Sequence, residues 1–248
     1  MPALAPCSNP CTDSLRETAL LDFSHPRLQL CARRLAGPGL TARDRVLAIH
    51  SFVRLIPFSM GAQPATPVPA SQVLRCERGD AHSKGVLFVA LCRAAGVPAR
   101  LRILRLRSDP LRALRGGHDG AVMHPVGQVW LEGRWLSTDA YLLDPLLFAQ
   151  ARRRQTQDRL DGWGPRPDAP AIWDGHDDCL QLFSPANVLH DPSSVHDPAP
   201  IAPHTGGPAQ VSLLARVRAL LHTRAHLDRQ LRHLREAPPP AGRRGSPG

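Results

Sequence analysis

Apolar residues recur at helical spacing in two stretches near the start of the chain. Residues 21–37 carry the first such pattern, which a Gly-Pro pair ends. The second stretch follows Thr41, a candidate N-cap with Asp44 three residues on, and Pro57 ends it. Both stretches are predicted to be helices, followed by a loop rich in Pro, Ala and Gly over about residues 61–70.

A third stretch is apolar on all sides, which is typical of a buried helix rather than of a surface helix. Asp80 is its candidate N-cap, and Gly96 with Pro98 beyond it provides the stop signal. Its apolar residues are Val86, Leu87, Val89, Ala90, Leu91, Ala94 and Ala95. The pattern predicts a central buried helix.

Strand-like patterns follow the buried helix. Residues 101–107 alternate imperfectly, and residues 127–140 contain two strand-like runs around Glu132 and Gly133, a pair that signals a hairpin. A short helix is predicted over residues 141–154. The fold class is therefore predicted as α+β, with N-terminal helices and a central buried helix packed on a small antiparallel sheet.

The remainder of the chain divides by composition. Residues 155–210 are rich in Pro, Asp, Gly and His and are predicted to be irregular, with Trp163 and Trp173 as packing anchors. Leucines in a 4-3 rhythm predict an amphipathic helix over residues 211–236, too short for a coiled coil and expected to pack back on the domain. The expected division is a flexible arm (1–20), a main domain (21–150), an irregular extension packed on it (151–210), this basic helix (211–236) and a disordered tail (237–248).

Composition supports a globular protein, because 42% of the 248 residues are hydrophobic and 21% are charged. No apolar run approaches the roughly 20 residues that a membrane-spanning helix needs. The N-terminal residues have neither a basic region nor a long apolar region of the secretory type. We therefore expect a soluble cytoplasmic protein.

The net charge is +10, and all the cationic residues except Lys84 are arginine. This preference is typical of codon bias in a GC-rich genome, such as a bacterial one. Residues 211–248 hold eight Arg against one Asp and one Glu, a net charge of 8 − 2 = +6. Such a segment can bind nucleic acid or anionic lipid, or it can simply be a solvated helix face.

The cysteine and histidine patterns do not favour a metal site. The six cysteines form no CxxC pair, and without a secretory signal a disulfide framework is not expected. Residues 176–179 (His-Asp-Asp-Cys) resemble a ligand cluster, but consecutive side chains rarely point toward one ion. No cofactor and no metal ion are expected.

Several motifs occur in one order: GDAHSKGVLFVALCRAAGVPAR, then HPVGQVWLEGRWLSTD. Over roughly residues 20–150 the chain resembles the transglutaminase-like superfamily, which shares the papain-like cysteine hydrolase fold. The resemblance implies a Cys-His-Asp triad in which a Cys opens the buried helix. The implied site residues are position 81 for the nucleophile, His124 and Asp139.

Spacing supports the pairing of the last two residues. His124 and Asp139 are fifteen residues apart, and the Glu132-Gly133 turn lies about midway between them. Two adjacent antiparallel strands joined by a tight turn can bring such positions side by side. We therefore expect their side chains to be hydrogen-bonded or nearly so, since a carboxylate on an imidazole fixes its tautomer.

The nucleophile is missing, because the position of the family's Cys is Ala81. An alanine side chain has no group that can attack a carbonyl. Cys76 lies in the approach loop, Ser83 is two residues on and points away by roughly 200°, and His82 would be an unusual nucleophile. An engineered Cys-to-Ala replacement is a further alternative. Lys84 near the helix start is interpreted as structural.

Three functions stay open at this stage. The first is a catalytically silent relative whose cleft binds a peptide or protein. The second is an active amidase, peptidase or acyltransferase, working through another nucleophile or with Cys in place of Ala81. The third is a nucleic-acid-associated protein that acts through the basic C-terminal helix, and no membrane partner is expected.

Overall fold

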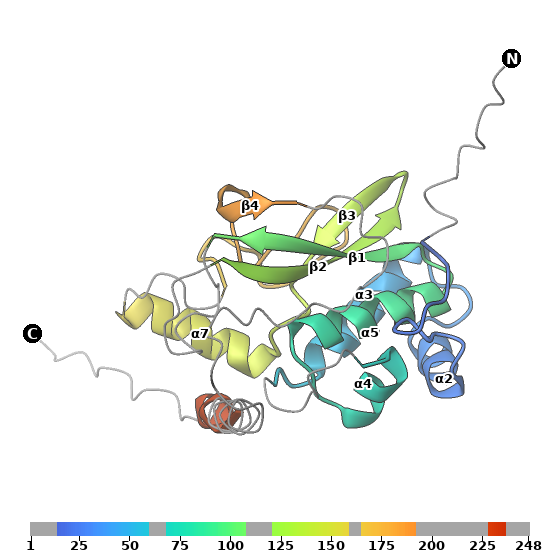
Figure 1. The fold of residues 1–248 in the computed structure, drawn as a ribbon, viewed down its shortest axis with the longest axis horizontal. Coiled ribbons are helices and arrows are strands. Elements are labelled where there is room, and N and C mark those ends of the chain that lie inside the picture. The colour runs from blue at the N-terminus through green and yellow to red at the C-terminus, as the bar shows by residue number, and fades with distance from the viewer. Residues whose placement is uncertain (1–13, 60–67, 108–120, 159–164, 192–227, 237–248) are drawn as a thin grey trace, which may run out of the picture.

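The computed structural model describes residues 14–59, 68–107, 121–158, 165–191 and 228–236 (Figure 1). Within these ranges the helices are α2 (Pro26–Leu35), α3 (Ala42–Leu55), α4 (Ala70–Cys76), α5 (Ala81–Ala94) and α7 (Pro145–Asp158). The strands are β1 (Ala99–Leu106), β2 (Val122–Leu131), β3 (Arg134–Thr138) and β4 (Val188–His190). A 3-10 turn, η1 (Pro185–Asn187), precedes β4, and residues 228–236 are also helical. None of the described helices has the length and apolar character that crossing a bilayer requires.

The two N-terminal helices form where their caps allow them to begin. Thr41 caps α3 with a complete capping box, since its hydroxyl accepts from the backbone of Asp44 and the Asp44 carboxylate accepts from the backbone of Thr41. The first helix begins later than the sequence pattern predicts, at Pro26 instead of residue 21. Proline is favoured at the first helical position because its missing N–H would have no partner there.

Helix α5 is the centre of the fold. Asp80 caps it as predicted, and Gly96 follows its end with φ of +75°. Each residue from Ser83 to Arg93 is buried. Helices α2, α3 and α4 contact α5, and the sheet covers it through β1 and β2 (Figure 1). This arrangement confirms the predicted α+β fold with a central helix on a small antiparallel sheet.

The sheet has the strand order β3-β2-β1-β4, and its pairs are antiparallel. The β2–β3 hairpin turns at Glu132 and Gly133, whose φ angles of 51° and 82° belong to a two-residue turn with both φ positive. Next to the turn, Trp130 lies opposite Trp135, with ring centroids 5.4 Å apart. The hairpin is therefore placed as the sequence predicts.

Both faces of the sheet are covered. On the α5 side the chain approaches closely at Gly127, where a Cβ atom would lie 2.8 Å from the ring of Phe88. A side chain at this position would force the helix away from the sheet. On the other face a second apolar cluster forms around Leu104, Leu106, Val126 and Phe183.

Other parts of the structure can also be compared with the sequence prediction. Helix α4 lies in a stretch where the periodicity predicts no helix, although the family resemblance over residues 20–150 includes it. Helix α7 runs from Pro145 to Asp158 and so crosses the expected boundary at residue 150. In the described part of the extension, residues 165–191, Trp173 packs in the main core as the predicted anchor, and Cys179 joins it there.

The described end of the predicted C-terminal helix packs on the domain. In its described part, residues 228–236, Leu231 and Leu234 are buried in the main core. The N-terminal arm, Trp163, the rest of the predicted helix and the tail over 237–248 lie outside the described residues, apart from residues 14–20 of the arm. The proposed domain limits therefore stay a prediction.

A buried histidine lies among aromatic rings under the sheet. The His50 ring is 3% exposed and lies 6.3 Å from the ring of Phe88, 6.1 Å from that of Tyr141 and 5.2 Å from that of Trp173. Its Nε2 atom has no hydrogen-bond partner among the described residues. Burial, together with the positive charges of Arg54 and Lys84, lowers the pKa of His50 to about 3.

We predict that His50 makes the protein acid-sensitive. Its pKa is about 3 in the folded chain and about 6.5 in the unfolded chain, so the unfolded state binds the proton first. The free energy of unfolding should fall as pH drops from about 6.5 toward 3, by on the order of a few kcal/mol. His50→Leu should flatten this slope in urea titrations at several pH values.

His176→Leu is the matched control, because His176 is exposed. It should retain the slope. If the free energy of unfolding depended equally on pH in the native chain and in the His50→Leu variant, His50 would not be the source of the acid sensitivity.

Candidate functional site

Position 81 is the first residue of the central helix. Asp80 Oδ1 accepts hydrogen bonds from Ser83 N at 2.9 Å and from Ser83 Oγ at 2.8 Å, which fixes the first turn. Ala81 itself is partly buried against the main core. A helix N-terminus presents unpaired N–H groups and a positive dipole end, so a thiol in this place would have its thiolate stabilised.

The other two predicted residues form a buried pair. His124 lies on β2 and Asp139 directly after β3, and the two residues are 5% and 0% exposed. His124 Nε2 is 3.0 Å from Asp139 Oδ2. The structure thus brings His124 and Asp139 together as the hairpin spacing indicates, although their roles in catalysis stay a prediction.

A later segment holds the carboxylate of this pair. Asp139 Oδ1 accepts from Gln181 N at 2.6 Å, and Asp139 Oδ2 accepts from Leu182 N at 3.2 Å. The ring of Phe183 contacts the ring of His124 edge-on, with centroids 5.1 Å apart. Residues 181–183 therefore orient both members of the pair.

The same segment is fixed to β3 by its backbone. Cys179 N donates to Ser137 O at 2.9 Å, and Asp139 N donates to Cys179 O at 3.3 Å. Ser137 N in turn donates to Asp178 Oδ1 at 2.7 Å. Residues 178–183 were not predicted to belong to the site. Their alternation of apolar residues, Leu180 and Leu182 before Phe183, indicates a buried segment but not the contact with Asp139.

The relation between position 81 and the pair is less direct. Ala81 contacts the main core, whereas Phe183, which contacts the His124 ring, belongs to the cluster on the other face of the sheet. A triad of the implied kind requires the Cβ of position 81 to face the His124 ring, and this orientation stays a prediction.

The alternative nucleophiles have other contacts. Ser83 is 3% exposed, and its hydroxyl lies within hydrogen-bond distance of its own cap. Cys76 ends α4, and the left-handed Glu77 follows it. His82 is a neutral imidazole near pH 7, because burial lowers its pKa against the opposing charge of Asp80. These contacts do not favour any of the three as a replacement.

Cys179 is a cysteine close to the pair, but it is chemically inert. It is 1% exposed, and burial with the added negative charge of Asp139 raises its pKa to about 12. Its thiol is therefore protonated at neutral pH and is not a nucleophile. Within the described ranges, no three His, Cys, Asp or Glu side chains are grouped so that they could hold a metal ion.

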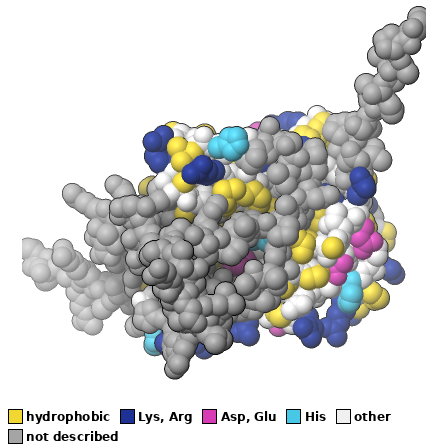
Figure 2. All heavy atoms as spheres, viewed as in Figure 1, with side chains coloured by type: hydrophobic (Ala, Val, Ile, Leu, Met, Phe, Trp, Pro, Cys, Tyr) yellow, Lys and Arg dark blue, Asp and Glu magenta, His cyan; other side chains and the backbone are white. Residues whose placement is uncertain are grey.

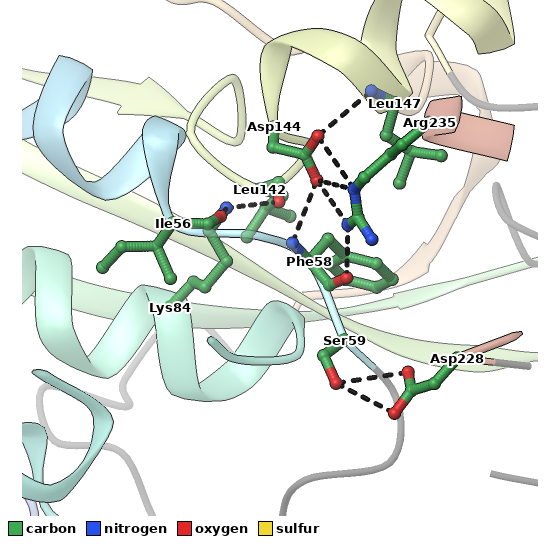
Figure 3. A network of polar contacts seen from close by, with 9 residues as sticks. All are labelled: Ile56, Phe58, Ser59, Lys84, Leu142, Asp144, Leu147, Asp228 and Arg235. Atoms are coloured by element: carbon green, nitrogen blue, oxygen red, sulfur yellow. Dashed lines mark hydrogen bonds and ion pairs between the residues drawn. The ribbon is translucent and has the colours of Figure 1, made fainter. Parts of the chain in front are cut away.

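Lys84 belongs to the set of polar contacts drawn in Figure 3, at the side where two backbone carbonyls surround its amine. Its amine is fully buried and donates to Ile56 O at 2.7 Å and to Leu142 O at 2.8 Å. Burial lowers its pKa to about 7, although the carboxylate of Asp144 opposes this shift. The two carbonyl contacts tie the end of α3 to the chain after β3, which fits a structural role.

The carboxylate of Asp144 belongs to the same set of polar contacts and forms an ion pair (Figure 3). Asp144 pairs with Arg235 of the C-terminal helix, with Arg235 Nη2 2.5 Å from Asp144 Oδ2. Burial would raise the pKa of Asp144, but the hydrogen bonds and charge of Arg235 hold it below its ordinary value. No pattern in the sequence indicates this ion pair, whose partners are 91 residues apart.

The comparisons with known proteins agree with this fold. Residues 30–140 match the family model of the transglutaminase-like superfamily. This part of the chain, which carries Ala81, His124 and Asp139, is thus similar to a transglutaminase-like core. No curated protein matches the chain.

One solved structure is similar in part. It is a crystal structure described as a "Putative Cysteine Protease from Cytophaga hutchinsonii", with 21% sequence identity and a TM-score of 0.46. The similarity covers 57% of this chain and 45% of that chain. The present chain thus matches less than half the length of that protein.

We predict that Asp139 contributes more to stability than His124. Asp139→Ala leaves the N–H groups of residues 181 and 182 without acceptors, at about 1–3 kcal/mol for each buried donor. His124→Ala leaves both of these bonds in place. Urea unfolding should show the larger loss for Asp139→Ala, by about 2 kcal/mol or more.

Asp139→Asn serves as the isosteric control. Its loss of unfolding free energy should lie between those of Asp139→Ala and His124→Ala. An equal or greater loss for His124→Ala would show that residues 181–182 do not depend on the carboxylate.

Proposed function

We propose that this protein is a catalytically silent transglutaminase-like protein that uses the region around position 81, His124 and Asp139 to bind a peptide or protein segment. One observation carries the proposal: alanine stands at the start of the central helix while the buried His124–Asp139 pair is intact.

The lack of a nucleophilic side chain supports the absence of catalytic activity. Acyl transfer through a covalent intermediate needs a group that attacks the carbonyl carbon, and a methyl group cannot do so. Ser83 lies within hydrogen-bond distance of Asp80, and the Cys179 thiol is protonated. A histidine and a carboxylate alone can accept and donate a proton, but they form no acyl intermediate.

The retained pair supports a role beyond folding. Burying an imidazole and a carboxylate is costly, and an apolar pair of similar volume often stabilises a fold as well or better. Here the Asp139 carboxylate also accepts hydrogen bonds from two backbone amides, and the His124 ring contacts the ring of Phe183. A polar extended segment, the substrate class of amide-cleaving and acyl-transferring relatives, is the ligand that we infer for the region around this pair.

An active enzyme is the second candidate. It applies where the natural residue at position 81 is cysteine, because the capped helix start and the His124–Asp139 pair would then supply the parts of an amidase, peptidase or acyltransferase site.

Nucleic-acid binding through the basic helix has less support. In the described part of that helix, Arg235 points inward to Asp144, while Arg229 and Arg232 are exposed. On the face that Figure 2 shows, the Lys and Arg side chains of the described residues lie at several separate places. A salt-dependent affinity for DNA that is lost with residues 211–248 would favour this function.

We predict that Ala81→Cys creates a reactive thiol in a chain that is otherwise inert. The native chain should neither incorporate an amine into a glutamine peptide nor hydrolyse peptide esters. In the variant, the helix N-terminus and a protonated His124 should lower the pKa of the new thiol. Iodoacetamide should therefore label position 81 of the variant faster than Cys76 or Cys92 at about pH 6, well below the ordinary thiol pKa of about 8.5.

Replacing His124 by Ala in this variant is the control, and labelling at position 81 should then slow. Peptide mapping identifies the labelled residue. Native-chain turnover that disappears with His124→Ala would refute the silent function. A thiol at position 81 that reacts no faster than an exposed thiol would limit the family likeness to the fold.

Peptide binding is predicted separately. Peptides selected on the native chain from a displayed random library should bind the Ala81→Arg variant at least about tenfold more weakly, a loss of roughly 1.4 kcal/mol. The larger side chain would fill the site at the helix start. Fluorescence anisotropy with a labelled selected peptide measures the affinities.

His176→Arg adds the same charge at an exposed place and should leave binding unchanged. Equal affinity for all three chains would place the peptides elsewhere on the surface.

A further inference from the structure

The turn that leads into position 81 is held by a short neighbouring segment, residues 57–59. Phe58 pairs with Gly79 in a parallel bridge. Ser59 N donates to Gly79 O at 2.9 Å, and Gly79 N donates to Pro57 O at 3.3 Å. Because Gly79 directly precedes the cap of α5, the place of this turn follows from the place of residues 57–59.

The contact between the turn and the helix leaves little free space. A Cβ atom on Gly79 would lie 2.6 Å from Ser83 Oγ and 3.3 Å from Lys84 Cγ. The bridge is thus pressed against the first turn of α5, where position 81 lies. A shift of residues 57–59 would reach that turn through backbone contacts rather than through flexible side chains.

The C-terminal helix holds residues 57–59. Arg235 Nη2 donates to Phe58 O at 2.6 Å, and Phe58 N donates to Asp144 Oδ2 at 3.0 Å (Figure 3). Since Arg235 also pairs with Asp144, both backbone groups of Phe58 belong to one closed set of hydrogen bonds. Ser59 Oγ adds a contact to Asp228 Oδ2 at 3.1 Å, about two helical turns before Arg235.

Packing and charge make this docking specific. Leu231 and Leu234 are 2% and 6% exposed, and they provide the apolar side of the contact. Asp144 is 4% exposed, so its carboxylate depends on Arg235 for charge compensation. Undocking of the helix would leave this carboxylate without its ion-pair partner and Phe58 O without its donor.

We propose that residues 228–236 act as a latch on residues 57–59 and, through Gly79, set the geometry of position 81. Arg235 is then a positioning residue of the site rather than a group that touches a ligand. The inference rests on the assignment of position 81 to the site, and it applies to a silent and to an active protein alike. By linkage, a ligand that needs the ordered turn also favours the docked helix.

Hydrogen exchange on the full chain with its native Ala81 tests the latch. Arg235→Gln should speed exchange of the Ser59 and Gly79 amides by about tenfold or more, while amides in the middle of α5 stay protected. Arg232→Gln is the matched control, because Arg232 is exposed on the same helix. It should change the exchange rate of neither the Ser59 amide nor the Gly79 amide. Ser59→Ala removes the contact to Asp228 alone and should give a smaller effect in the same direction.

A second measurement uses the Ala81→Cys background. Arg235→Gln should move the pH midpoint of iodoacetamide labelling at position 81 toward that of a free thiol, and Arg232→Gln should not. Exchange at Ser59 and Gly79 that is unchanged, or that rises equally throughout the protein, overturns the latch. Because exchange is read with Ala81 present, a latch that fails there is distinguishable from a site that merely fails to activate an introduced thiol.

If Arg235→Gln does not fold, Ser59→Ala decides, since it leaves the Asp144–Arg235 pair intact. Faster exchange at Gly79 in that variant supports the latch, and native exchange rates there overturn it.

Discussion

The complete burial of helix α5 is the constraint on which the rest of this structure depends. From Ser83 to Arg93 the helix has no exposed residue, so every side of it must be covered by another part of the chain. Helices α2, α3 and α4 cover it on one side and β1 with β2 on the other, where Gly127 permits contact with Phe88. The polar residues of the helix then need internal partners, and Lys84 finds two backbone carbonyls.

The same constraint explains how the site is built. A buried helix begins at a fixed place, because its cap and its first turn are enclosed by neighbouring segments. Asp80 and Gly79 occupy this enclosed start, and two carboxylates on the chain after β3 serve as anchors nearby in sequence. Asp139 binds residues 181–182, and Asp144 binds Arg235. Each anchor attaches a late part of the chain to the core.

The sequence predicted those features that depend on local chemistry. The capping box at Thr41, the cap at Asp80, the apolar run of α5 and the Glu132-Gly133 turn each have a short-range signature, and the structure contains all of them. The spacing of His124 and Asp139 belongs to the same class, since one hairpin joins them. Helix α4 has no periodic signature, because seven residues are too few to show a helical period.

The contacts that sequence analysis missed are of a different kind. Residues 181 and 182 bind Asp139 with backbone amides, which every residue except proline possesses, so no side chain marks them. Arg235 is one of thirty arginines, and nothing in its neighbours distinguishes a buried ion pair from a solvated charge. Contacts over such separations follow from the assembled fold.

Asp139 is anchored by two residues that follow it 42 and 43 positions later, which has a consequence for the order of assembly. During synthesis, the hairpin that carries His124 and Asp139 leaves the ribosome well before residues 179–183. In that interval the Asp139 carboxylate has water in place of two amide donors, and the His124 ring lacks its aromatic neighbour. The pair is therefore completed late, by contacts with residues that lie beyond residue 140, where the similarity to the family model ends.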